Sequence, residues 1–182
     1  MSTFHSPIWE QFLVRIRTYP KNLHRLQPPC PEDRIEAVQM ELGKMPNALV
    51  AMLRLFNGAQ LFFVNGPAVS LFGITPTPPL PPLESAPDWH IEVFTPAWRN
   101  ASPGREHEWT IAMMSYGVLI ILDRDGIIKQ FERNTRTWDA APMRFDEWID
   151  DQFKEGNTML DELKNDSIEA ILRIGENERN RE

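Results

Sequence analysis

The sequence predicts an α+β domain with a mostly antiparallel sheet and helices packed on it. Three observations predict this class. Three strand-like runs follow one another between residues 109 and 133, helical periodicity marks the segments on both sides, and one hairpin signal joins two of the runs. That signal is Asp125-Gly126, because a type I′ hairpin turn needs positive φ at both central residues. We therefore expect a central β-meander at 109–133.

The meander is expected to contain strands at Trp109–Ser115, Val118–Leu122 and Ile127–Arg133. The middle run is Val-Leu-Ile-Ile-Leu and is apolar at every position. A strand with one wet face would alternate between apolar and polar residues. We therefore expect this strand to be central and covered on both faces.

Composition limits the class of protein. The chain has 182 residues and one cysteine, Cys30, so it suits one domain with extensions and a reducing cytoplasm. It has no run of 18 apolar residues and no basic and apolar leader, so we expect neither a membrane span nor a secretory signal. Residues 1–144 carry 14 acids and 14 bases, whereas residues 145–182 carry 12 acids and 5 bases, which accounts for the net charge of −7. We expect no nucleic-acid partner, because no basic stripe is visible.

The first half of the chain reads as three helices. Residues 7–17 form the first, which begins at Pro7, and residues 20–30 follow as a proline-containing linker. Pro31 opens a second helix that Gly43 ends. Pro46 opens a third, which Asn57-Gly58 is expected to close with a left-handed cap. We treat 1–30 as an N-terminal extension.

Strands are expected next at Gln60–Val64 and Val69–Ile74, on either side of Asn65-Gly66-Pro67. Residues 75–87 hold six prolines and read as a polyproline-like surface loop. Residues 88–100 read as one or two helical turns, with Thr95-Pro96 as a cap and first position.

The last part of the chain follows the meander. A loop at 133–142 contains Trp138, and a core-facing helical stripe then runs from Phe145 to Phe153 and ends at Gly156. A further amphipathic helix is expected at 158–174. The main domain is placed at 31–155 and an acidic helical tail at 156–182.

The order of these pieces resembles one known family. A helix ends at Leu42-Gly43, and Met45-Pro46 leads to Phe56-Asn57-Gly58; the strands Leu71-Phe72-Gly73-Ile74 and Leu122-Asp123 follow, before a helix that begins Phe145-Asp146-Glu147-Trp148-Ile149. Over residues 31–155 this is similar to the SUKH superfamily, which is typified by a yeast cell-wall synthesis regulator (the Smi/Knr family) and found in many bacterial immunity proteins. The resemblance implies a binding module rather than an enzyme. It also implies a cytoplasmic immunity protein that neutralises a cognate toxin domain, in a toxin–antitoxin arrangement.

No catalytic or cofactor-binding pattern stands out against this background. His107-Glu108 does not continue as HExxH, and Asp123 to Gly126 lacks the later ligands of a calcium loop, so a turn is the better interpretation. Cys30 lies between two prolines and suits a structural joint. Glu106 and Glu108 read as a solvated edge rather than a catalytic pair. We expect no metal and no cofactor.

The partner is expected to be a protein. A basic, nuclease-like toxin domain is the first candidate, because acidic residues complement a basic surface. The alternative is a regulatory or scaffolding module without a toxin, which could form a homodimer. Aromatic side chains at strand ends and acids near the C-terminus are the candidate partner-binding residues. They are Glu106, Glu108, Trp109, Tyr116, Trp138, Asp150, Asp151, Asp161 and Glu162.

Overall fold

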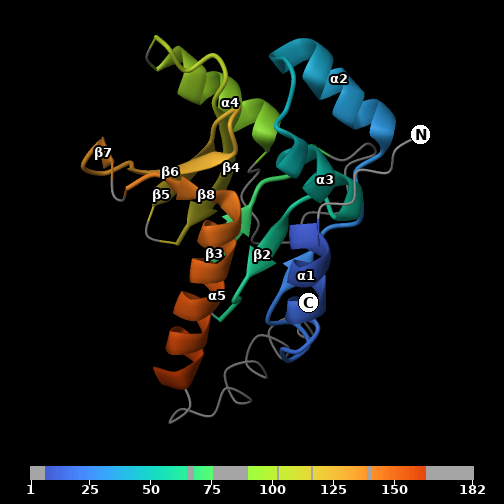
Figure 1. The fold of residues 1–182 in the computed structure, drawn as a ribbon, viewed down its shortest axis with the longest axis vertical. Coiled ribbons are helices and arrows are strands. Elements are labelled where there is room, and N and C mark those ends of the chain that lie inside the picture. The colour runs from blue at the N-terminus through green and yellow to red at the C-terminus, as the bar shows by residue number, and fades with distance from the viewer. Residues whose placement is uncertain are drawn as a thin grey trace, which may run out of the picture.

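The computed structural model describes residues 7–64, 68–75, 90–101, 103–115, 117–138 and 141–162. Within these residues the chain forms five helices and one eight-stranded antiparallel sheet in meander order, so the α+β class is confirmed (Figure 1). The helices are α1 (Pro7–Ile16), α2 (Glu32–Leu42), α3 (Asn47–Leu55), α4 (Ile91–Asn100) and α5 (Phe145–Glu162). The strands are β1 (Arg25–Leu26), β2 (Ala59–Leu61), β3 (Val69–Leu71), β4 (Trp109–Met114), β5 (Val118–Leu122), β6 (Ile127–Glu132), β7 (Thr137–Trp138) and β8 (Met143–Arg144).

The predicted meander is confirmed in position and pairing. β4 pairs with β5 and β5 with β6, both antiparallel. All five residues of β5 are buried, as an apolar strand between two neighbours requires. From β4 the sheet continues through β3 and β2 to β1, and from β6 it continues to β7, while β8 also pairs with β6.

The hairpin between β5 and β6 uses a different turn from the expected one. Asp123 donates its N–H to the carbonyl of Ile127 at 3.0 Å, and its own carbonyl accepts the N–H of Gly126 at 3.2 Å. Three residues therefore form the loop. Gly126 adopts a φ of 81°, whereas Asp125 does not adopt a positive φ. This is a three-residue loop with glycine in the left-handed position, not a type I′ turn.

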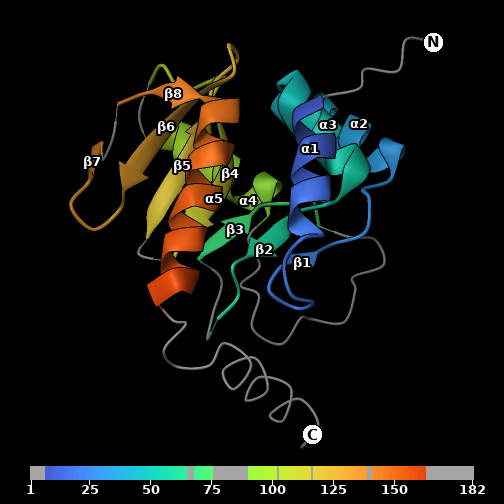
Figure 2. The same ribbon diagram turned by 60° about the horizontal axis from the view of Figure 1, so that its bottom comes forward.

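Helices cover the meander on both faces. The hydroxyls of Thr95 on α4 and Thr110 on β4 lie 3.1 Å apart in the core. Because Thr110 pairs with Ile121, α4 lies on the face that carries both residues. Figures 1 and 2 show α5 in front of the opposite face, with α1 next to it. Side chains alternate along a strand, so β5 needs apolar residues at every position to meet both layers.

The N-terminal helix belongs to the main core, so the expectation of a separate extension at 1–30 is wrong. Trp9 is fully buried, and its ring lies 5.3 Å from that of Phe56 and 5.2 Å from that of Phe145 on α5. Phe12 packs on Phe153 of α5 at 5.5 Å. Such tilted ring contacts stabilise a core beyond the area they bury. They fix α1 against α5.

The linker expected at 20–30 contains strand β1, where Arg25 pairs with Gln60 of β2. A two-residue strand is too short for its pattern to reveal. His24 precedes it, and its ring lies 4.9 Å from that of Tyr19 and 4.7 Å from that of Phe62. Burial lowers the pKa of His24 from 6.5 to about 4, so the folded protein holds the ring neutral.

Asn57-Gly58 does not cap α3, which ends earlier, at Leu55. Asn57 instead reaches the segment after β3. Its side-chain oxygen accepts the N–H of Ile74 at 2.7 Å, and its Nδ2 donates to the carbonyl of Ile74 at 2.6 Å. Gly73 is required beside it, because a Cβ there would lie 2.1 Å from the carbonyl oxygen of Asn57. The side-chain amide of Asn57 thus makes both hydrogen bonds to Ile74 that a neighbouring strand would make.

Residues 91–100 form one helix, α4, so the expectation of a new start at Thr95-Pro96 is wrong. Pro96 lies inside the helix and removes one helical hydrogen bond. The neighbouring Thr95 has a tertiary role that compensates for this loss: its hydroxyl accepts the N–H of Thr110 at 3.2 Å. The contact between Thr95 and Thr110 of β4 therefore favours a continuous helix through Pro96, which the local sequence alone does not specify.

The final helix does not end at Gly156, and α5 runs on without interruption to Glu162. Gly156 is present because of packing. A Cβ at this position would lie 2.2–2.4 Å from ring atoms of Phe62, which itself adopts a φ of 51°. The boundary drawn between a domain and a tail at 156 therefore falls inside one helix, and Leu160 beyond it is buried.

Three expectations lie outside the described residues: the turn at 65–67, the proline-rich loop from 76 onward, and the helix expected beyond Glu162. Among the described segments, no helix combines the length and apolar character needed to cross a membrane.

Gly156→Ala should destabilise the protein by about 2 kcal/mol, because the added methyl group must displace the ring of Phe62 in a packed core. Thr158→Ala, at an exposed position of the same helix, should change stability by less than about 0.5 kcal/mol. Urea denaturation measures both. A stabilised Gly156→Ala protein would show that helix propensity, not ring packing, decides this position.

The wild-type protein should lose stability as the pH falls from about 6.5 to about 4, because the unfolded state binds a proton at His24 that the folded state excludes. His24→Gln should lack this part of the loss, which we expect to be on the order of 1–2 kcal/mol once the partial exposure of the ring is considered. Urea titrations of both proteins across this range provide the measurement. Parallel curves for the two proteins would contradict the assignment to His24.

Candidate protein-interaction surface

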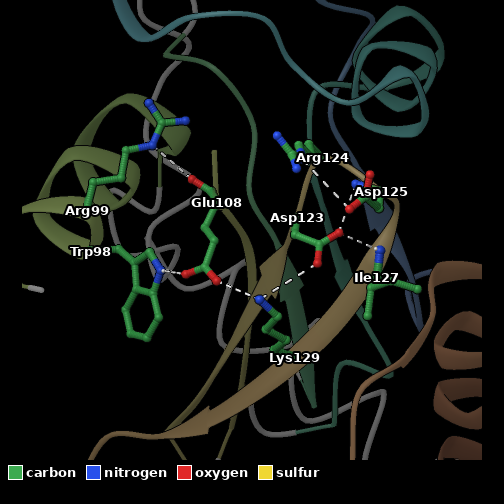
Figure 3. A network of polar contacts seen from close by, with 8 residues as sticks. All are labelled: Trp98, Arg99, Glu108, Asp123, Arg124, Asp125, Ile127 and Lys129. Carbon is green, nitrogen blue, oxygen red and sulfur yellow. Dashed lines mark hydrogen bonds and ion pairs between the residues drawn. The ribbon is translucent and has the colours of Figure 1, made fainter. Parts of the chain in front are cut away.

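Glu108 is the centre of a polar network at the start of β4 (Figure 3). Its Oε2 accepts a hydrogen bond from Nε1 of Trp98 at 2.7 Å, and its Oε1 accepts one from Nζ of Lys129 at 2.7 Å. Its backbone carbonyl accepts Nε–H of Arg99 at 2.9 Å. The residue is only 9% exposed, and both carboxylate oxygens have the partners that a buried charge requires. Glu108 therefore joins α4, β4 and β6.

Lys129 and Asp123 extend this network to the β5–β6 hairpin. Lys129 Nζ lies 3.7 Å from Asp123 Oδ2, and its hydrogen bond to Glu108 is the main reason that the pKa of Lys129 is raised. Asp123 Oδ1 accepts the N–H groups of Asp125 at 2.9 Å and Ile127 at 3.0 Å. Asp123 thus shapes the turn, which agrees with the turn interpretation of this segment.

Glu106 and Glu108 do not form a solvated pair. Glu106 is exposed, and backbone N–H groups, its own and that of Gly104, lower the pKa of its carboxyl. Glu108 points inward instead, because Trp98 and Lys129 supply the hydrogen bonds that allow its burial. The expectation of a solvated edge is therefore confirmed for Glu106 and wrong for Glu108.

Trp109 is a core residue, with 1% of its surface exposed. The guanidinium of Arg99 lies over its ring, 4.6 Å from the centroid, and donates to the carbonyl of Leu42 at 2.6 Å. Burial lowers the pKa of Arg99. Other side chains of the described structure, Arg99 among them, thus enclose the ring of Trp109, so the ring is not exposed to a partner.

Trp138 ends a row of three aromatic rings and faces solvent. Trp98, Phe131 and Trp138 contact one another at centroid separations of 5.0, 5.4 and 5.9 Å. Trp98 is 5% exposed, whereas Trp138 is 49% exposed. Arg105 stacks on Trp98, 3.8 Å from its centroid. Of the aromatic candidates that the structure describes, Trp138 is the one available to a partner.

The acidic candidates lie on α5. Asp150, Asp161 and Glu162 are exposed and Asp151 is half-buried. Asp150 accepts a hydrogen bond from Arg15 of α1 at 2.9 Å, and Asp151 accepts one from Lys154 at 2.7 Å.

A groove of about 410 Å³ separates α5 from α1. Phe12, Ile149 and Phe153 supply its apolar lining, and Arg15 and Asp150 stand at its side. The guanidinium of Arg15 also lies 4.2 Å from the ring centroid of Phe153. Of the acids of α5, Asp146 and Asp150 border this groove.

Tyr116 and Cys30 contribute nothing to this surface in the described structure. Tyr116 lies outside the described residues. Cys30 is buried, and burial raises the pKa of its thiol to about 11, which suits the structural joint that its flanking prolines suggest. Across the described ranges no group of three or more His, Cys, Asp or Glu side chains is placed to hold a metal ion.

Sequence reasoning missed Trp98, Arg105 and Arg15, although all three shape this surface. Trp98 bonds to Glu108, Arg105 stacks on Trp98, and Arg15 pairs with Asp150 across 135 residues. No local pattern signals such a pair. A helical wheel of α4 could have suggested that Trp98 faces the sheet, since Ile91, Thr95 and Trp98 share one buried stripe.

No protein-family model matches the chain, and no curated protein matches it.

Glu108→Ala should destabilise the protein by about 3 kcal/mol, because it leaves Lys129 and the indole N–H of Trp98 without their buried acceptor. Glu106→Ala, two residues away and exposed, should cost less than about 0.5 kcal/mol. Chemical denaturation measures both differences. Equal effects of the two substitutions would contradict the role assigned to Glu108.

Proposed function

We propose that this protein is a non-catalytic protein-binding module of the immunity type, which captures a basic toxin domain through the acidic surface of α5. The charge of this helix carries the proposal. α5 has seven acidic residues and one basic residue, Lys154. Arg15 and Arg144 from neighbouring segments pair with two of the acids. Seven acids against three cations leave four negative charges along one helix.

The groove beside α5 adds shape to this charge. Protein interfaces combine an apolar centre with a polar rim. The groove has such a composition, with Phe12 and Phe153 in its lining and the Arg15–Asp150 ion pair at its side. A partner with a basic surface would be steered by the charge and fixed by the groove.

Two further points support this proposal. The order of elements over 31–155 resembles the SUKH superfamily, whose bacterial members include immunity proteins. The polar groups of the meander also bond to one another: Glu108, Lys129 and Asp123 are each engaged in holding strands and helices together. Such groups stabilise a rigid scaffold, which favours binding through a preformed surface.

Glu155→Lys with Glu162→Lys should strongly reduce capture of the native partner, because the change of four charges cancels the surplus of four negative charges on α5. The matched control is Glu36→Lys with Glu41→Lys, which makes the same change at exposed positions of α2. The measurement is quantitative copurification from the native host at several salt concentrations. It is followed by a test of whether the captured protein is a toxin that the wild-type chain inhibits.

The expected result is a basic captured protein whose recovery falls at least about tenfold with the α5 variant and hardly changes with the control. Equal loss with both variants would contradict a role for α5. A captured protein without toxic activity would favour the regulatory or scaffolding alternative instead.

A further inference from the structure

The edge of the sheet at β6 and β7 carries a second exposed surface, unlike that of α5. Phe131 pairs with Trp138 across the two strands, so their side chains lie on one face. This is the face of α4, since Trp98 of α4 contacts both rings. Half of Trp138 is open to solvent. We call Trp98, Arg105, Phe131, Arg133 and Trp138 the arginine–tryptophan edge.

Two arginines of this edge have no acidic partner among the described residues. The guanidinium of Arg105 lies over the ring of Trp98, 3.8 Å from its centroid, and Arg133 donates a hydrogen bond to the sulfur of Met113 at 3.6 Å. Met113, Leu119 and Phe131 are successive partners across β4, β5 and β6, so Arg133 lies on the same face as the aromatic row. The cations near α5 differ, because Arg15, Arg144 and Lys154 each have a carboxylate within 3.0 Å.

The described carboxylates next to these arginines in the chain, those of Glu106, Glu108 and Glu132, bond elsewhere and do not neutralise them. Glu106 turns back to accept the N–H of Gly104 at 3.2 Å, and Glu132 accepts the N–H of Asn134 at 2.7 Å. Glu108 is used by Trp98 and Lys129, as Figure 3 shows. On the face of the sheet that carries Trp138, these two guanidinium groups therefore present positive charge on a protein whose net charge is −7.

The edge is also held rigid from behind. The hydrogen bond from Trp98 to Glu108 fixes the buried ring (Figure 3). This ring contacts both Arg105 and Trp138. A side chain that is already ordered loses little entropy when it binds. Half-exposed tryptophan and arginine are the residue types that most often supply the binding energy of an interface.

We propose that the arginine–tryptophan edge is a docking surface for an acidic peptide segment that carries one apolar anchor residue. Carboxylates of the segment bind the guanidinium groups of Arg105 and Arg133, which suit bidentate hydrogen bonds. The anchor packs on the exposed indole of Trp138. This surface differs in charge and place from the proposed toxin-binding surface, so either one can exist without the other.

A peptide accounts for the edge better than a nucleic acid does. Binding of single strands uses a continuous basic groove with several stacking rings. The edge offers one half-exposed ring and two arginines that lack a carboxylate partner, on an acidic protein. An acidic segment with one anchor matches this number of contacts.

The test uses the full chain and short synthetic peptides with a central phenylalanine, flanked by Asp and Glu, by Asn and Gln, or by Lys and Arg. A short oligothymidylate is the nucleic-acid probe. Binding is followed by NMR through the indole N–H signal of Trp138, assigned with Trp138→Phe. The variants are Trp138→Ala and Arg105→Gln with Arg133→Gln. The matched control is Arg17→Gln with Arg124→Gln, which removes the same charge at exposed positions elsewhere.

The acidic peptide alone should bind and shift the Trp138 signal. Trp138→Ala and the Arg105/Arg133 variant should each weaken binding at least about tenfold, and the control by less than about twofold. Added salt should weaken binding to the wild type more than to the Arg105/Arg133 variant. Thermal denaturation checks that each variant is folded.

Several results would overturn the proposal: no binding of the acidic peptide at millimolar concentration, equal binding of the neutral or basic peptide, preference for oligothymidylate, or full binding by Trp138→Ala. None of these results bears on capture of a basic partner by α5.

Discussion

The burial of β5 on both faces is the constraint that orders this fold. Its five apolar residues leave no face for water, so one layer must cover each side of the meander. On one side α4 is fixed by two contacts to β4: Thr95 with Thr110, and Trp98 with Glu108. On the other side α5 lies over the sheet, and α1 packs against α5. The acidic surface belongs to the α5 layer, whereas the arginine–tryptophan edge lies where the α4 layer meets the sheet at β6 and β7.

The two layers are held in place by different kinds of contact. The contact between α4 and the meander includes a buried charge, Glu108, whose ion pair with Lys129 spans from β4 to β6. The contact between α1 and α5 is mainly aromatic, with Phe12 on Phe153 and Trp9 on Phe145. A buried carboxylate needs its partners at fixed positions, whereas rings tolerate many orientations. The polar network therefore fixes the position of α4 relative to β4, through the bonds of Glu108 to Trp98 and Arg99.

Much of the fold was predictable because it is encoded locally. The meander, three of the helices and the covered central strand follow from periodicity, proline, glycine and one Asp-Gly pair. Predictions were wrong where a distant side chain decided the outcome. Gly156 reads as a helix end, but it is there for the ring of Phe62, and Glu108 reads as solvated until Trp98 is placed beside it. For the candidate surface, the residue types were predictable and their exposure was not: Trp109 and Trp138 look alike in sequence, yet one is buried and the other half-exposed.

The contacts between the first and last helices affect how the chain is made. Arg15 meets Asp150 and Tyr19 meets Asn157 across separations of 135 and 138 residues. During translation the aromatic face of α1 leaves the ribosome long before the helix that covers it. Phe56 can cover one side of Trp9 and Phe12 early, but the sides that meet α5 stay uncovered until α5 is synthesised. Contacts of such long range also form slowly. The nascent chain thus presents part of the apolar face of α1 to chaperones until α5 emerges, and this part of the core closes only then.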